Sequence, residues 1–247
     1  MFHQITMRNF IIIFIFLPVT IFSQVVNVES KRQSNEKGWS GTTILSFDYN
    51  SSEQVDWELS NTSYFQWDNN NWSFLILNEI NFDRAGGIDF ENEGYQHLRL
   101  SKHVSSIFTS ETYLQNQFDP IRKIQNRKLF GTGIRARLSY KNYIGISTFY
   151  ELEKLSYDVI NNDFRISTYL QLDFDLTEKI KLLTTTYIQS KINQFSDFKV
   201  SSASQLNFEV SGALSFTNNF EIFYDAFPAS GIKAISYKLQ NGIKYNF

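Results

Sequence analysis

The sequence contains no cysteine and only three prolines among its 247 residues. The absence of cysteine excludes a disulfide scaffold, a thiolate metal site and a cysteine nucleophile. Charged residues make up only 19% of the chain and the formal net charge is -2, which argues against nucleic acid as a partner. Beyond the N-terminal region no run of about 18 apolar residues occurs, so the sequence offers no further candidate for a helical membrane span.

Aromatic side chains, by contrast, are abundant and account for 17% of the residues, with 24 Phe and 13 Tyr. This share of large apolar side chains excludes an intrinsically disordered chain. The mean hydropathy of -0.28 nevertheless resembles that of a soluble protein, because Asn, Ser and Thr are interspersed among the rings. The order of apolar and polar residues is therefore more informative than their proportions.

The first 23 residues have the layout of a secretory signal peptide. Arg8 gives a weakly positive start, an apolar run extends from Phe10 to Phe22, and the small residue Ser23 follows. A run of about 13 residues is too short to span a bilayer comfortably, so we expect cleavage after Ser23 rather than an uncleaved anchor. Cleavage removes one of the 23 basic residues, which leaves 22 against 25 acidic residues and a net charge of -3.

From residue 38 onward apolar and polar positions alternate, over stretches that are longer than the strands of most soluble proteins. Side chains of a strand point alternately to opposite faces, so the pattern predicts strands with one apolar and one polar face. One stretch places Phe164, Ile166, Thr168, Leu170, Leu172 and Phe174 on the apolar face. About twelve such stretches begin near residues 38, 53, 71, 94, 106, 128, 142, 163, 179, 204, 219 and 234.

The connections between the predicted strands are of two kinds. Short turns are expected at 68–71, 103–106, 141–142, 177–178 and 217–219, and longer loops at 84–93, 119–127, 155–162, 192–203 and 227–233. Short and long connections therefore alternate, except for a brief first connection at 50–52. This alternation is typical of a membrane barrel with short periplasmic turns and longer outer loops. Pro120 and Pro228 fall in predicted loops, as expected if central strands need every backbone N–H.

Aromatic residues of the apolar face gather near the short turns, as at Trp67, Trp72, Phe216 and Phe220. Such a band is typical of the aromatic girdle of a membrane barrel. We therefore expect an all-β fold, a transmembrane antiparallel up-and-down β-barrel of about twelve strands over residues 38–247 in the outer membrane. The polar segment 24–37 is expected to be a periplasmic lead, either flexible or inserted into the barrel as a small plug.

The end of the chain reads QNGIKYNF and resembles the signal by which the bacterial barrel-assembly machinery recognises its clients. That signal has a polar residue, a glycine, a hydrophobic residue and a final aromatic residue at fixed spacing. Gln240, Gly242, Tyr245 and Phe247 fill these four positions. The resemblance implies that the assembly machinery is a partner during insertion.

Several strings together resemble the salt-induced outer-membrane protein family of uncharacterised bacterial barrels. They are VVNVESKR, GYQHLRL, ETYLQNQFDPIRK, RKLFGTGIRARL, STYLQLDFDLTEKI and YKLQNGIKYNF. The resemblance implies a barrel in the outer membrane and a link to osmotic or ionic stress. None of the strings indicates a particular chemistry.

If the apolar face contacts lipid, the polar face lines the interior and places charges of both signs there. The candidate lumen-lining residues are Glu79, Arg99, Glu111, Arg135, Arg137, Glu151, Arg165 and Asp173. In one interpretation the arginines form a basic track that attracts anionic solutes through a narrow channel. In the other the same groups pair into a closed ionic plug, because buried charges need partners, and the barrel is a structural or stress-response protein without transport.

Motifs for catalysis or metal binding are weak. The segment GTGIRA, residues 131–136, has the letters of a dinucleotide fingerprint, but its period of two predicts a strand where that motif requires a helix. His103 and Ser105 have the spacing of a lipid-modifying barrel enzyme, yet they fall in a predicted turn, so this remains a remote alternative. We expect no enzymatic activity, no cofactor and no metal site.

The expected partners are outer-membrane lipid and lipopolysaccharide. A basic cluster of Arg122, Lys123, Arg127 and Lys128 falls in a predicted outer loop, where it either contacts lipopolysaccharide phosphates or is simply solvated. The sequence leaves the oligomeric state open.

Overall fold

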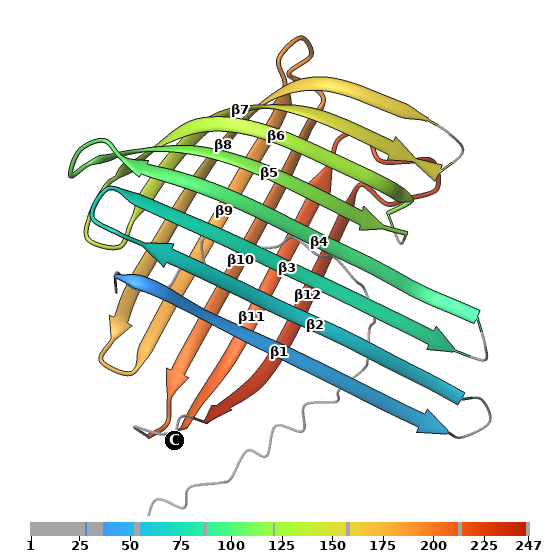
Figure 1. The fold of residues 1–247 in the computed structure, drawn as a ribbon. Coiled ribbons are helices and arrows are strands. Elements are labelled where there is room, and N and C mark those ends of the chain that lie inside the picture. Colours follow the sequence, from blue (N-terminus) through green and yellow to red (C-terminus); the bar gives the residue numbers. More distant parts are fainter. Residues whose placement is uncertain are drawn as a thin grey trace, which may run out of the picture.

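The computed structural model describes residues 28, 37–51, 55–85, 88–120, 122–156, 159–211 and 214–245. In this part of the chain twelve strands form one sheet, and each strand pairs antiparallel with its neighbours in sequence (Figure 1). The strands are β1 (Gly38–Ser51), β2 (Val55–Asp68), β3 (Trp72–Ala85), β4 (Ile88–His103), β5 (Phe108–Asp119), β6 (Ile124–Arg137), β7 (Tyr143–Leu155), β8 (Ile160–Thr177), β9 (Ile180–Lys191), β10 (Phe198–Glu209), β11 (Leu214–Asp225) and β12 (Ile235–Tyr245). The expected all-β, up-and-down arrangement of about twelve antiparallel strands is confirmed.

Three strands begin five or six residues before their expected starts, namely β4, β10 and β11. In β10 the outward hydroxyls of Ser202 and Ser204 bond to Thr186 and Thr184 of β9, each at 2.8 Å. Polar residues therefore occupy both faces there, which concealed the alternation. The expected turn at 217–219 lies within β11, where Asn218 donates its amide to Asn241 of β12 at 2.6 Å. Residues typical of turns here form a cross-strand pair instead.

The expected alternation of short and long connections is wrong. One end of the sheet, the turn end, carries the connections 69–71, 104–107, 138–142, 178–179 and 210–213. The other end, the loop end, carries 52–54, 86–87, 120–123, 156–159, 192–197 and 226–234. Only the last two are longer than every connection at the turn end, because strand pairing continues into the segments expected to be loops. Pro120 and Pro228 do lie outside the strands, as expected.

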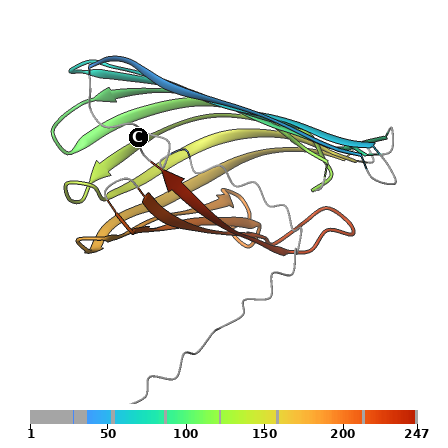
Figure 2. The ribbon, with the colours of Figure 1, turned by 90° about the horizontal axis from the view of Figure 1, so that it is seen from below.

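The sheet curls so that its first half faces its second half, which Figure 2 shows as two layers, blue to green above and yellow to red below. Partners in adjacent strands share a face, so one set of alternate residues lines the concave side. That side carries the buried residues, including Leu75, Leu77 and Tyr95, whereas most of the exposed large apolar side chains of the strands lie on the convex side. Among the described residues β1 and β12 do not pair, so the sheet is open along this seam.

The stagger of the strands shows how the seam would close. One row of backbone partners begins at Gly38, the first residue of β1, and ends at Asp225 of β11. Asp225 donates its N–H to the carbonyl of Ala234, the residue just before β12. The row therefore starts at the turn end of β1 and reaches β12 at the loop end. Across the sheet it shifts along the strand direction by about the length of one strand. Pairing β1 with β12 along their lengths gives a shear of about 14, a strand tilt of about 39° and a diameter of about 24 Å, within the range of closed barrels.

This closure predicts that Phe47 of β1 lies opposite Leu239 of β12, with both side chains on the outer face. Because the chain has no cysteine of its own, the double variant Phe47→Cys/Leu239→Cys should form a single disulfide on mild oxidation. The change is measured as a mobility shift in non-reducing electrophoresis that reductant reverses. The control pair Phe47→Cys/Ser236→Cys, which places the two thiols on opposite faces, should not cross-link. Absence of cross-linking by both pairs would contradict closure in this register.

Candidate functional site

All eight predicted lumen residues lie on the concave face, at very different depths. Five of them are buried, namely Arg99, Glu111, Arg135, Glu151 and Arg165. Glu79 and Asp173 are half-buried, and Arg137 is exposed near the turn end. The buried five fall into two ion-paired groups, one nearer each end of the sheet.

The first group, the Glu151 cluster, consists of Arg127, Glu151, Glu153, Arg165 and Lys199 in the loop-end half of the concave face. Glu151 has 0% exposed surface. Its two carboxylate oxygens accept from the Nε atoms of Arg127 and Arg165, each at 2.5 Å, and Lys199 Nζ lies 3.8 Å away. Three cations therefore surround one buried carboxylate.

Further ion pairs extend the Glu151 cluster across neighbouring strands. Lys199 contacts Glu153 at 3.0 Å and Asp225 at 3.8 Å. Arg165 contacts Asp197 at 2.9 Å, and Asp197 also contacts Lys191 at 2.9 Å. The network joins residues of every strand from β6 to β11. The contacts of Lys199 with Glu151 and Glu153 join β10 to β7, three strands away, and so link parts of the curled wall that do not pair through their backbones.

The second group, the Glu111 cluster, lies nearer the turn end and consists of Arg99, Ser101, Glu111 and Arg135. Glu111 is 3.4 Å from Arg99 and 3.6 Å from Arg135, and it accepts a bond of 3.4 Å from Ser101. The guanidinium of Arg135 also lies over the ring of Tyr143, 4.7 Å from its centroid. Here two arginines share one carboxylate.

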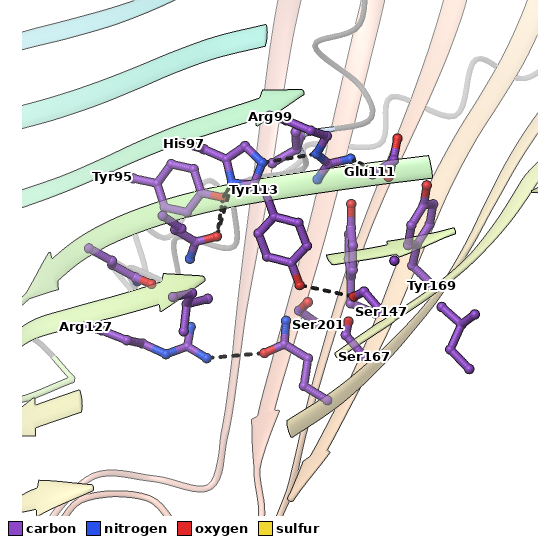
Figure 3. Close-up of a pocket in the computed structure, with 18 of the residues that line it drawn as sticks. Tyr95, His97, Arg99, Glu111, Tyr113, Arg127, Ser147, Ser167, Tyr169 and Ser201 are labelled. Carbon is purple, nitrogen blue, oxygen red and sulfur yellow. Dashed lines mark hydrogen bonds and ion pairs between the residues drawn. The ribbon is translucent and has the colours of Figure 1, made fainter. Parts of the chain in front are cut away.

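A layer of rings and small polar groups separates the two clusters around a cavity of about 100 Å³ (Figure 3). Arg99 donates to Nε2 of His97 at 3.2 Å, so the ring proton of a neutral His97 is on Nδ1. The His97 ring stacks between those of Tyr95 and Tyr113, with centroids 6.1 and 5.6 Å apart. Tyr113 in turn bonds to Ser147 at 3.1 Å. These rings narrow the interior between the clusters.

Glycines make room for rings on the concave face. A Cβ on Gly131 would overlap the ring of Tyr113, and one on Gly145 would overlap the ring of Tyr169. Each glycine is the backbone partner of the tyrosine that covers it. The absence of a side chain at these two positions therefore lets the tyrosines lie flat against the wall.

Larger cavities lie at each end of the concave face. The cavity at the loop end measures about 480 Å³ and the one at the turn end about 520 Å³. Arg127 lines both the loop-end cavity and the central cavity. Glu111 lines the central cavity and its ion-pair partner Arg135 lines the turn-end cavity. The three cavities thus follow one another, separated by ion-paired side chains.

Sequence reasoning missed several members of the Glu151 cluster. Arg127 was expected in a basic outer loop but lies in β6, buried on the concave face. Lys199 was expected in the loop 192–203 but lies in β10. Arg127 and Arg135 are separated by an even number of residues in the same strand, so their side chains share a face. This spacing is the sequence signal that could have placed Arg127 on the inner face. Arg122 of the same predicted basic loop pairs with Asp119 at 3.3 Å, so the cluster does not form one exposed basic patch.

In the N-terminal lead the structure describes Val28, whose side chain is buried against Leu75, Leu77 and Tyr95 of the concave face. The expected signal peptide, residues 1–23, and the rest of the lead before residue 37 lie outside the described residues. In the expected assembly signal, the backbones of Gln240, Gly242 and Tyr245 belong to β12, whereas Phe247 lies outside the described residues.

The weak catalytic motifs occur in structural roles. GTGIRA lies within β6, and Ser105 accepts bonds from the N–H groups of Ile107 and Phe108 in the β4–β5 turn. His103, at the end of β4, lies 3.2 Å from the hydroxyl of Thr109. The part of the chain that the structure describes contains no group of three His, Asp or Glu side chains arranged to hold a metal ion. It also contains no helix that is long and apolar enough to cross a membrane.

No family model matches the chain, and no curated protein sequence matches it. The solved structures similar to it include the porin NanC in a rhombohedral crystal form, with 10% identity and a TM-score of 0.48, over 83% of this chain and 99% of that one. They also include the porin KdgM, with 8% identity and a TM-score of 0.41, over 83% and 99%. The resemblance to the salt-induced family is not confirmed by these matches.

Proposed function

We propose that the chain is an outer-membrane β-barrel that forms a narrow channel for small polar or anionic solutes. The observation that carries the proposal is the succession of three cavities along the concave face, with ion-paired side chains between them. In the arrangement described, the Glu151 and Glu111 clusters close the passage. Rearrangement of these side chains, without any change in strand pairing, connects the cavities.

The outer face supports the membrane location. Large apolar side chains on the convex side are exposed, including Phe130, Ile146 and Leu114, in a way that water would penalise and lipid would not. Trp72, Phe216 and further exposed rings lie on this face near the turn end. Such a band is typical of side chains at a membrane interface. Lipid and lipopolysaccharide are therefore the partners proposed for the outer face, and the barrel-assembly machinery for insertion.

The central cavity supports a preference for anions. The charged residues that line it are Arg99, Glu111, Arg122 and Arg127, three cations against one carboxylate. A passage of this width brings a permeating ion close to these groups, where their field is strong. The proposal assigns no enzymatic activity to the chain.

A planar lipid bilayer tests the proposal directly. We expect the purified protein to give discrete conductance steps, with a reversal potential in a salt gradient that indicates anion preference. The double variant Arg135→Ala/Arg137→Ala should reduce this preference, because it removes two cations at the turn-end cavity. Unchanged selectivity in the double variant would contradict a basic track, and conductance no higher than that of the bare bilayer would contradict the channel itself.

A second candidate is a closed structural barrel of the envelope, without transport. It is favoured by the complete burial of Glu151 and by the near-complete burial of Phe149 on the concave face. Buried charges need partners, and a network in which they are paired can fill the interior as a plug. The same bilayer measurement separates the two candidates. A deletion strain that grows poorly only at high salt, together with absent conductance, would support the structural role.

A further inference from the structure

Two connections of the loop end meet over the concave face, although they are far apart in sequence. Lys123, in the connection 120–123, donates from Nζ to the carbonyl oxygen of Ser230, in the connection 226–234, at 2.7 Å. Next to it, the guanidinium of Arg122 lies over the ring of Phe223 in β11, 4.2 Å from the centroid. We call this pair of contacts the loop clasp. It joins the β5–β6 connection to the opposite side of the curled sheet.

The cavity of about 480 Å³ lies beside the loop clasp and is within the size range of small-molecule sites. A large part of its wall is apolar, which is unusual for an interior otherwise lined by charges. The apolar lining consists of Ile124, Leu155, Phe223, Phe227, Pro228, Ile232 and Ile235. A polar solute would leave this wall in contact with water, so the wall favours a ligand with an apolar body.

Among the charged side chains of the lining, cations outnumber carboxylates. Arg122, Arg127, Lys199 and Lys233 face two carboxylates, Glu153 and Asp225. Both carboxylates already contact Lys199, at 3.0 and 3.8 Å. Lys233 is exposed and makes no ion pair among the described residues. The cavity therefore keeps at least one cationic group, Lys233, that an anion can use.

Arg122 is the cation placed most favourably between the two parts of the wall. Its guanidinium stacks on the ring of Phe223, which belongs to the apolar wall, and forms an ion pair with Asp119. Burial lowers the pKa of its guanidinium, although Asp119 opposes that shift. Arginine remains charged at neutral pH despite such burial, so Arg122 still attracts an anion.

We propose that the loop-end cavity binds an amphiphilic anion, a compact apolar or aromatic molecule that carries one carboxylate, sulfonate or phosphate group. The apolar body packs against Phe223, Phe227 and Ile232. The anionic group lies toward Arg122 and Lys233. The inference goes beyond the channel, because binding at this site needs no passage through the barrel.

The test is isothermal titration of the full-length protein in lipid nanodiscs with three probes, corrected for empty nanodiscs. 2-Naphthalenesulfonate carries both features, 2-naphthalenemethanol carries only the rings, and methanesulfonate carries only the charge. We expect the first to bind at least about tenfold more tightly than either of the others, since each lacks one half of the complementarity.

Variants locate the site. Phe223→Ala should weaken binding of 2-naphthalenesulfonate by about 10- to 100-fold, because it removes a large part of the apolar wall. Ile232→Ser tests the same wall from a connection outside the strands, where folding is least affected. Arg122→Gln/Lys233→Gln should weaken the sulfonate but not the alcohol. Lys141→Gln, in a turn at the other end, should change neither.

Equal affinity for the three probes, or unchanged affinity in both Phe223→Ala and Ile232→Ser, would overturn the inference. Its outcome is distinguishable from that of the channel proposal. Binding without conductance supports the site and contradicts the channel. Conductance without binding supports the channel and contradicts the site.

Discussion

Replacing Glu151 with glutamine should lower the free energy of unfolding by about 3–5 kcal/mol, because it leaves buried cations without their shared counter-charge. Glutamine has nearly the same shape, so packing is retained while the charge is lost. Arg127, Arg165 and Lys199 would then repel one another in largely buried surroundings, where water screens their charges weakly. The effect is measured by urea unfolding from lipid vesicles, followed by tryptophan fluorescence.

Two further variants test the cause of this loss. Arg127→Gln in the Glu151→Gln background should recover part of the stability, because it removes one of the unmatched cations. Lys141→Gln breaks a surface pair with Asp175 and should cost at most about 0.5 kcal/mol. A loss below about 1 kcal/mol for Glu151→Gln would mean that water reaches the cluster, which the burial of Glu151 argues against.

The substitution Phe130→Arg should make folding into a bilayer less favourable by about 2–4 kcal/mol. Phe130 lies midway along β6, its side chain is 56% exposed, and its partners Leu114 and Tyr150 are also on the outer face. If this face lies in hydrocarbon, the arginine must be dehydrated or must deform the bilayer. Reversible folding into vesicles, with the denaturant midpoint as readout, measures the cost.

The same substitution at the end of the barrel provides the matched control. Val210 is 60% exposed and lies at the start of the β10–β11 turn. Val210→Arg should cost no more than about 1 kcal/mol, because an interfacial arginine stays hydrated. Equal and small effects at both positions would indicate that water, not lipid, covers the outer face.

Alternation was sufficient to predict twelve strands because most strands place apolar residues on one face only. In β8 six apolar or β-branched residues alternate with polar ones from Phe164 to Phe174. The prediction was displaced in β10, where serines point outward and satisfy their hydroxyls against threonines of β9. Local sequence carries the period of a strand but not the identity of its cross-strand partners.

The sequence predicted which side chains of the site lie on the inner face, but not which of them contact one another. Phase alone placed Glu151 and Arg165 on the inner face. Their contact depends on the stagger between β7 and β8, in which Glu151 is the backbone partner of Asp163 rather than of Arg165. Lys199 reaches Glu151 from three strands away because the sheet curls. Register and curvature accumulate over many strands, so no single segment of sequence contains them.

The seam between β1 and β12 has a consequence for how the chain assembles. Every other pairing joins strands adjacent in sequence, so the sheet can grow one hairpin at a time with low contact order. Only the inferred pairing of β1 with β12 joins the two ends of the strand series, and without it two strand edges carry unpaired N–H and C=O groups. Hydrocarbon penalises each such group by several kcal/mol. If the outer face lies in lipid, as proposed, an unfinished sheet should remain at the membrane surface or be held by another protein, and insertion and closure should be one event.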